Sequence, residues 1–172
     1  MNCGNCGAPM VFVWDRDHFF CEYCKTCEFL AGSPADIKVV DEKSGVVCSL
    51  CDTEMQVASM MQVRVLQCVN CRGLLIGQDR FLALITGLRA AATEPPITPG
   101  PLNREELRRK VHCTRCKGVM DTHPYGGPGN IVVDNCEKCQ IIWLDYGELK
   151  KVINAPGRDR GARDTRGQDL DT

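Results

Sequence analysis

The sequence lacks several features that would place it in a common class of protein. No segment approaches the roughly 18 consecutive apolar residues of a membrane span, and the first residues contain neither the basic nor the apolar segment of a secretion signal. Lys and Arg (21) do not exceed Asp and Glu (22), so the formal net charge is −1. These absences predict a cytoplasmic protein with no membrane partner, and they disfavour nucleic-acid binding that depends on charge alone.

The sequence also lacks long amphipathic segments, but it is rich in cysteine. The apolar residues are scattered in short runs, too few in any one segment to build a core. The 172 residues include 13 cysteines, almost all in Cys-x-x-Cys pairs. In a cytoplasm that keeps thiols reduced, this regular spacing favours metal binding over disulfide bonds.

Six of the pairs assemble in order into three sets of four. The two pairs of each set are separated by 14, 16 and 19 residues, which is at or just below the spacing typical of four-thiolate zinc sites. We therefore predict three structural Zn²⁺ ions, bound by Cys3, Cys6, Cys21 and Cys24, by Cys48, Cys51, Cys68 and Cys71, and by Cys113, Cys116, Cys136 and Cys139.

This pattern predicts a small metal-stabilised α+β fold of three tandem zinc ribbons, each a β-hairpin with four-cysteine knuckles, with short helices after the second and third. Zinc would supply on the order of 10 kcal/mol or more per site, so metal-free protein should be largely unfolded. Each filled site adds a charge of about −2, and three sites take the total to about −7.

The ligand set of the first ribbon has an alternative, because Cys27 extends Cys21 and Cys24 into a run of three cysteines. Pairing Cys24 with Cys27 would lengthen the gap to 17 residues. We favour Cys21 and Cys24, because Phe19 and Phe20 then enter the knuckle directly from a strand. The spare thiol is interpreted as inert, with a reactive or metal-relaying role as the alternative.

Other local patterns give the expected organisation of the chain. Met10, Met55 and Met120 each lie four residues after the second cysteine of a set, as core residues beneath the knuckles would. Strands are expected near 11–14, 63–65 and 131–133, with helices near 79–92, near 103–110, and after Asp145 with Glu148 as its capping partner. The expected units are ribbon one (1–45), ribbon two with its helix (46–92), a proline-rich spacer (93–102), ribbon three with flanking helices (103–155) and a disordered tail (156–172). The spacer is expected to hold ribbon three apart, giving an elongated molecule.

The third set carries a resemblance to a known family. Its sequence, Cys113-Thr-Arg-Cys116 followed by Cys136-Glu-Lys-Cys139 and the ending Trp-Leu-Asp-Tyr-Gly-Glu-Leu at residues 143–149, resembles the transcription factor IIB-type zinc ribbon family of many small bacterial proteins. The resemblance implies a zinc ribbon with a short C-terminal helix, and it implies no reaction. Ribbon two matches in its ligands and trailing helix but has Leu75, Ile76 and Gly77 in place of Trp143, Leu144 and Asp145, and ribbon one matches only in ligands and hairpin.

The tip of ribbon three is the candidate recognition loop. Residues 123–130 contain three glycines and two prolines, which would expose backbone amides at a fixed turn. The residues proposed for recognition are His123, Tyr125, Gly126, Gly127 and Asn130. The alternative is a turn that only connects two strands. Two other histidines, His18 and His112, lie outside complete quartets and are expected to be structural or solvated. The basic residues Arg104, Arg108, Arg109 and Lys110 are expected to form a solvated helix face, with contact to phosphates as the alternative.

Closed four-cysteine sites offer neither an open metal position nor an activated nucleophile. The sequence therefore predicts a non-catalytic zinc-binding protein that acts as a protein interaction module or adaptor. The alternative is a nucleic-acid or transcription-machinery binding protein that stacks bases on Phe12, Trp14 and Tyr125.

Overall fold

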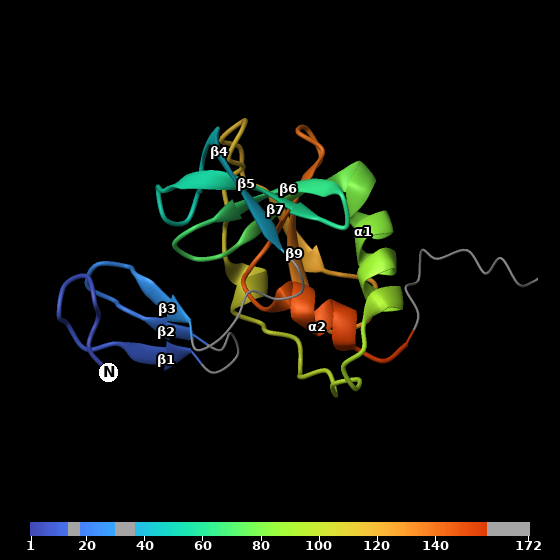
Figure 1. The fold of residues 1–172 in the computed structure, drawn as a ribbon, viewed down its shortest axis with the longest axis horizontal. Helices are drawn as coiled ribbons and strands as arrows, with labels where there is room; N and C mark the ends of the chain where they lie inside the picture. The colour runs from blue at the N-terminus through green and yellow to red at the C-terminus, as the bar shows by residue number, and fades with distance from the viewer. Residues whose placement is uncertain (14–17, 30–36, 158–172) are drawn as a thin grey trace, which may run out of the picture.

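The computed structural model describes residues 1–13, 18–29 and 37–157, which form two β-sheets and two α-helices (Figure 1). The predicted disordered tail, apart from residues 156 and 157, and the predicted turn at residues 15–17 lie outside the described residues. The three cysteine sets, the predominance of strands and the two helices are as predicted.

Ribbon one forms a sheet of its own. Its antiparallel strands are β1 (Val11–Val13), β2 (His18–Phe20) and β3 (Cys27–Phe29). β1 and β2 are the predicted hairpin, whereas β3, which follows the second knuckle, was not expected. Phe12 packs on Phe19 with ring centroids 4.9 Å apart.

Ribbons two and three share a single seven-stranded antiparallel sheet. Its first strand includes residues 38–45, which were expected to belong to ribbon one, so ribbon two begins earlier than predicted. The strand order of the sheet is β4-β5-β6-β7-β10-β9-β8. The strands are β4 (Lys38–Val47), β5 (Glu54–Met60), β6 (Val63–Cys68), β7 (Leu74–Gly77), β8 (Asp121–Pro124), β9 (Val132–Cys136) and β10 (Ile141–Leu144).

The two ribbons meet where β7 pairs with β10, and this pairing contradicts the expected separation of ribbon three. Leu75 lies directly opposite Trp143, and each is the fourth residue after the last cysteine of its ribbon, so an approximate two-fold axis passes between them. The proline-rich segment does not hold the ribbons apart. It contacts the C-terminal residue of the helix Glu148–Asn154, where the Ile97 amide donates to the Asn154 carbonyl at 2.8 Å. It also contacts the loop of ribbon three, where Asn130 Nδ2 donates to the Gly100 carbonyl at 3.1 Å.

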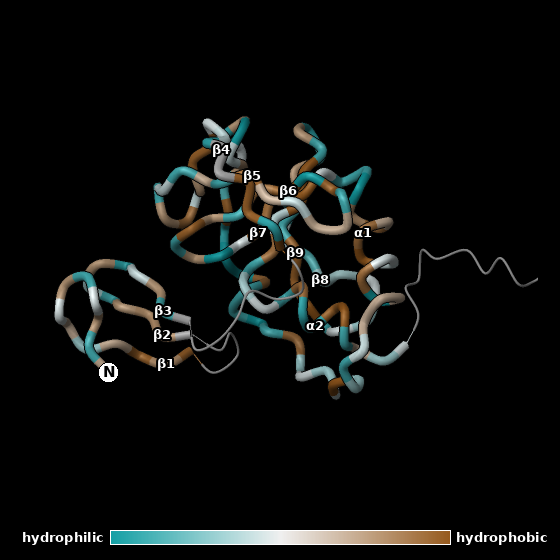
Figure 2. Tube along the Cα trace, in the orientation of Figure 1, coloured by the Kyte–Doolittle hydropathy of each residue, from teal (hydrophilic) through white to brown (hydrophobic). Residues whose placement is uncertain are grey.

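The shared sheet separates two cores, because successive residues of a strand point to opposite faces. Leu74 and Ile76 of β7 belong to a core with both helices, whereas Leu75 belongs to a second core with the cysteines of ribbons two and three. Figure 2 shows hydrophobic stretches of the two helices and of the central strands side by side. The first core therefore binds the two ribbons together independently of their metal sites.

The helices follow the last strands of ribbons two and three. Helix α1 (Gln78–Ala91) buries Phe81, Leu84, Ile85 and Leu88, and α2 (Glu148–Asn154) buries Leu149, Val152 and Ile153. The predicted helix near 103–110 is only a 3₁₀ turn, η1 (Glu106–Arg108), although Asn103 Oδ1 accepts the Glu105 and Glu106 amides as a cap would. The turn ends because Arg109 adopts an extended conformation, and its side chain reaches two buried carboxylates described below.

Candidate metal centres

All six Cys-x-x-Cys knuckles have the same backbone conformation. In each, the residue directly after the second cysteine has a positive φ: Gly7, Lys25, Asp52, Arg72, Lys117 and Gln140, with φ between 52° and 74°. In ribbon three, for example, the Lys117 amide donates to the Cys113 carbonyl at 3.0 Å and the Cys113 amide to the Gly118 carbonyl at 2.8 Å. Five of these six residues are not glycine, and a left-handed conformation costs a non-glycine residue free energy. Interactions within the folded knuckle must offset that cost.

The sulfur atoms are spaced as a tetrahedral zinc site requires. A Zn–S bond of about 2.3 Å places the four sulfurs of a tetrahedron about 3.8 Å apart. The Sγ–Sγ distances are 3.5 Å for Cys3 and Cys24, 3.9 Å for Cys48 and Cys71, and 3.7 Å for Cys116 and Cys136. They are far longer than the roughly 2.05 Å of a disulfide, and within each quartet the ligand atoms lie within 4.8 Å of one another. All three four-cysteine groups could therefore hold zinc.

Hydrogen bonds prepare some of these thiols for metal binding. The Thr26 hydroxyl, 3.2 Å from Cys24 Sγ, lowers the pKa of Cys24 to about 5, and a backbone hydrogen bond at Gly118 lowers the pKa of Cys116 to about 7. At Cys139, in contrast, burial raises the pKa of the thiol to about 12 and so disfavours the thiolate. Without metal, four adjacent thiolates repel one another, and a bound divalent cation removes that repulsion.

In ribbon one, the structure brings Cys21 and Cys24 together with Cys3 and Cys6. Cys27 instead begins β3, opposite Phe20 of β2. Lys25, with φ 62°, occupies the position after Cys24 that a left-handed residue occupies in every other knuckle. A knuckle made by Cys24 and Cys27 would not share that conformation.

Methionine fills the space beneath each metal site. Met10, Met55 and Met120 are all buried, and each packs with the cysteines of its own ribbon. Ribbon one has a small separate core, whereas Met55 and Met120 lie in one cluster with cysteines of both other ribbons. The second and third metal sites are thus two ends of a continuous core.

Trp143 is the largest side chain in the core between those sites. It is only 2% exposed, and its indole ring lies against Gly73, directly after the left-handed Arg72 of the ribbon-two knuckle. A Cβ atom at Gly73 would lie 2.5 Å from Trp143 Cη2. At the position related by the two-fold axis, Leu75 and Ile141 lie in the same core. The interface therefore pairs Trp143 with Gly73 on one side of the two-fold axis, and Leu75 with Ile141 on the other side.

A buried ionic network stands beside Trp143. Arg109 Nη2 lies 2.8 Å from Asp134 Oδ2, and Arg109 Nη1 lies 2.6 Å from Asp145 Oδ2. Thr122 Oγ1 donates to Asp134 Oδ1 at 2.5 Å, and Trp143 Nε1 donates to Asp145 Oδ1 at 3.1 Å. Burial raises the pKa of Asp134, while the Thr122 hydrogen bond and the Arg109 charge oppose that shift. Arg109 therefore has a structural role, because it pairs with two buried carboxylates. The solvated helix face predicted for this basic run is wrong for Arg109.

Two further carboxylates extend this network. Glu106 and Glu148 are buried, and with Asp145 their ligand atoms lie within 4.8 Å of one another. One half of the predicted capping interaction is present, because the Asp145 amide donates to Glu148 Oε2 at 2.6 Å. Asp145 is not the N-cap residue, however, because helix α2 begins after Gly147. Sequence reasoning missed Glu106 and Asp134, which look like ordinary surface charges. Asp134 could have been found from its place in an apolar strand.

The candidate recognition loop is packed onto the helices more than expected. The Tyr125 ring makes an edge contact with Phe81 of α1, with centroids 5.5 Å apart. Gly129, with φ 103°, lies so close to α2 that a Cβ atom there would be 3.0 Å from the Lys151 carbonyl oxygen. Gly126 and Asn130 are exposed, and Gly127 and His123 are partly exposed. Only part of this loop remains open to a partner.

The histidines stand outside the three cysteine quartets. His112 is exposed, and its backbone forms an isolated bridge with Val119. The side chain of His18 and the whole of Trp14 lie outside the described residues.

Comparison with known proteins gives one match. Residues 112–155 match the model of a zinc ribbon family described as "Transcription factor zinc-finger". This segment contains only the third cysteine quartet, and the first two are not matched by it. No curated protein and no solved structure matches the chain. In the described part of the chain, no helix is both long and apolar enough to cross a membrane.

Proposed function

We propose that the chain is a non-catalytic zinc-binding protein whose three ribbons are structural, and that it acts as a protein interaction module or adaptor. The observation that carries this proposal is the geometry of the quartets. Each brings four sulfurs together at the spacing of a closed tetrahedron. A closed site has no position for a substrate or an activated water molecule, so its contribution is to hold the surrounding surface in shape.

The surface of the seven-stranded sheet supports contact with protein. Edge strand β4 exposes Val39, Val40 and Val47, each by 41% or more. Unpaired sheet edges with apolar side chains are places where another chain can pack or add a strand.

A second candidate is a protein that binds nucleic acid or the transcription machinery. The family description of residues 112–155 favours it. The charge of the chain opposes the nucleic-acid form, because −1 becomes about −7 with three filled sites. The stacking residues offered for it are also less accessible than expected, since Phe12 packs on Phe19 and Tyr125 on Phe81.

Affinity capture with and without nuclease distinguishes the adaptor from the nucleic-acid-binding candidate. Tagged, zinc-loaded chain is expected to retain the same protein partners after nuclease treatment. Loss of all partners on nuclease treatment would instead favour the nucleic-acid candidate. A direct measurement complements it: random duplex DNA should bind no more tightly than about 10⁻⁴ to 10⁻⁶ M at physiological salt, and submicromolar affinity with a steep salt dependence would contradict the adaptor proposal.

A further inference from the structure

The approximate two-fold axis relates a filled site in ribbon three to an open groove in ribbon two. Counted from the cysteines, Trp143, Asp145, Asp134 and Arg109 of ribbon three correspond to Leu75, Gly77, Leu66 and Ser44 of ribbon two. The ribbon-three residues pack tightly and pair with one another. Their ribbon-two counterparts are smaller or apolar, and together they line a groove of about 460 Å³.

The floor of the groove is apolar. Leu66 lies opposite Leu75 across β6 and β7, so the two side chains share one face of the sheet. Val46 of β4 and Ile141 of β10 also line the groove. The volume falls within the range of ligand-binding pockets, and none of the residues that line it is aromatic. The groove therefore offers aliphatic surface to an incoming side chain but no ring on which a nucleic-acid base could stack.

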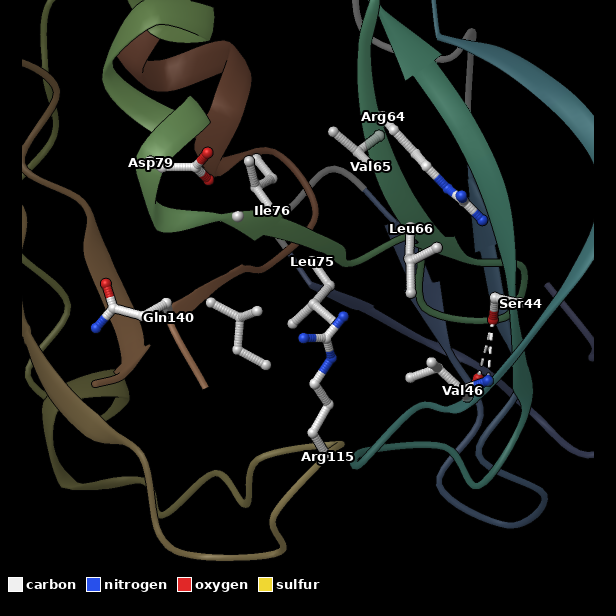
Figure 3. Close-up of a pocket in the computed structure, with 12 residues that line it drawn as sticks. Ser44, Val46, Arg64, Val65, Leu66, Leu75, Ile76, Asp79, Arg115 and Gln140 are labelled. Atoms are coloured by element: carbon white, nitrogen blue, oxygen red, sulfur yellow. Dashed lines mark hydrogen bonds between the residues drawn. The ribbon is translucent and has the colours of Figure 1, made fainter. Parts of the chain in front are cut away.

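Two arginines give the groove its charge. Arg64 of β6 and Arg115 of the ribbon-three knuckle both line it and are exposed. Figure 3 shows Arg115 extending from its knuckle towards Leu75, with Arg64 on the other side of Leu66. The acidic residue at the groove, Asp79, has Nε of Arg80 3.1 Å from its Oδ2. Guanidinium groups bind carboxylates through paired hydrogen bonds.

We propose that this groove binds a segment of a partner protein that carries a large apolar side chain, such as an aromatic ring, close to a carboxylate. This is the chemistry that Trp143 and Asp145 supply at the corresponding place in ribbon three. The apolar side chain packs on the half-buried Leu66 and on the small exposed parts of Leu75 and Ile141, each of which is 5% exposed. The carboxylate binds Arg64 or Arg115. The inference rests on the proposed interaction function and names the kind of partner.

The first experiment uses a defined peptide. A fluorescein-labelled peptide with the central sequence Glu-Trp-Leu-Asp-Glu between Gly-Ser ends is titrated with zinc-loaded full-length chain, and fluorescence anisotropy is measured. We expect saturable binding. A peptide with Ala in place of Trp, and one with Gln and Asn in place of the acids, should each bind about tenfold more weakly or worse, because each removes one of the two contacts.

Charge reversal then locates the binding. Arg64→Glu and Arg115→Glu, combined, should lower the affinity at least about tenfold, whereas Arg104→Glu, an exposed arginine that does not line the groove, should leave it unchanged. The combined variant should also gain affinity for a peptide with Lys in place of the acidic residues. Native mass spectrometry of each variant checks that three zinc ions remain.

Other outcomes overturn the proposal. Equal binding by the combined variant and by wild type would place the peptide elsewhere. Tight binding of oligothymidylate that depends on Arg64 and Arg115 would assign the groove to nucleic acid. Failure of the groove is distinct from failure of the adaptor function: if the combined variant still captures every nuclease-resistant protein partner of the wild type, the adaptor function stands and the groove is not its binding site.

Discussion

Trp143 of ribbon three lies against Gly73 of ribbon two, at a point where no side chain would fit between them. This contact joins the two ribbons across the β7–β10 pairing. It explains why ribbon three has Trp143 where ribbon two has Leu75. Trp143 faces Gly73 on the opposite ribbon, whereas Leu75 faces the larger Ile141. The two ribbons are thus complementary parts of one domain.

Gly73→Ala tests this contact. The added methyl group would overlap the indole ring, and overpacking of this kind costs about 1–3 kcal/mol in the free energy of unfolding. Denaturant unfolding of the zinc-loaded chain measures it. Gly126→Ala is the matched control, because Gly126 is exposed and a Cβ atom there has nothing within 4 Å. An equal effect of the two substitutions would show that Trp143 is not held against the knuckle.

Arg109→Ala should be more damaging than its position in a charged run suggests. It leaves Asp134 and Asp145 buried without their cation, and breaking a buried ion pair in this way costs about 3 kcal/mol. Arg108→Ala, which removes an exposed neighbour, should change stability by less than about 0.5 kcal/mol. Adding Asp134→Asn to Arg109→Ala should restore part of the loss, and no recovery in this double variant would show that an uncompensated charge on Asp134 is not the cause.

Tyr125→Ala should destabilise the chain, although the sequence predicts that this residue serves recognition. The ring packs on Phe81, and its loss should cost about 1–3 kcal/mol. His123→Ala should have little effect, because His123 Nδ1 contacts only the adjacent Pro124 carbonyl at 3.1 Å among the hydrogen bonds described. Thermal unfolding compares them. If neither variant loses stability, Tyr125 is available to a partner after all.

The spare thiol of ribbon one can be distinguished from the ligands by metal content. Native mass spectrometry should find three zinc ions in the wild type and in Cys27→Ser, and two in Cys24→Ser, because Cys24 lies within the quartet and Cys27 in β3. The reverse result would assign Cys27 as a ligand. Fewer than three ions in freshly purified, reduced wild type would contradict the structural role proposed for zinc.

Zinc should be released as the pH falls. Metal binding requires thiolates, so the bound form carries fewer protons than the metal-free form, and its stability is lost as pH decreases. Burial raises the pKa of metal-free Cys139 to about 12, so zinc must displace a proton from it even at neutral pH. A chromogenic zinc indicator followed from about pH 8 to about pH 5 measures the release. Zinc retention that does not change over this range would mean that protons do not compete for the ligands.

The metal sites were predictable because they depend on spacing over short distances. Two cysteines in a knuckle, and a methionine four residues on, need no knowledge of the rest of the chain. The pairing of β7 with β10 was not predicted, because it joins residues 74–77 to residues 141–144. A signal was present: both segments are continuous apolar runs without alternation, which is typical of strands buried on both faces. Arg109, Glu106 and Asp134 were missed because burial of a charge depends on long-range packing that no local pattern records.

The shared sheet also determines how the molecule should come apart. Ribbons two and three have both a common helix-covered core and a common cysteine-lined core, so removal of either metal ion exposes apolar surface that belongs to both. Their unfolding should therefore be a single cooperative transition, in which a chelator that takes the first ion from this domain makes the second easier to remove. Ribbon one, with its own sheet and its own small core, can lose and regain its metal while the rest of the protein stays folded.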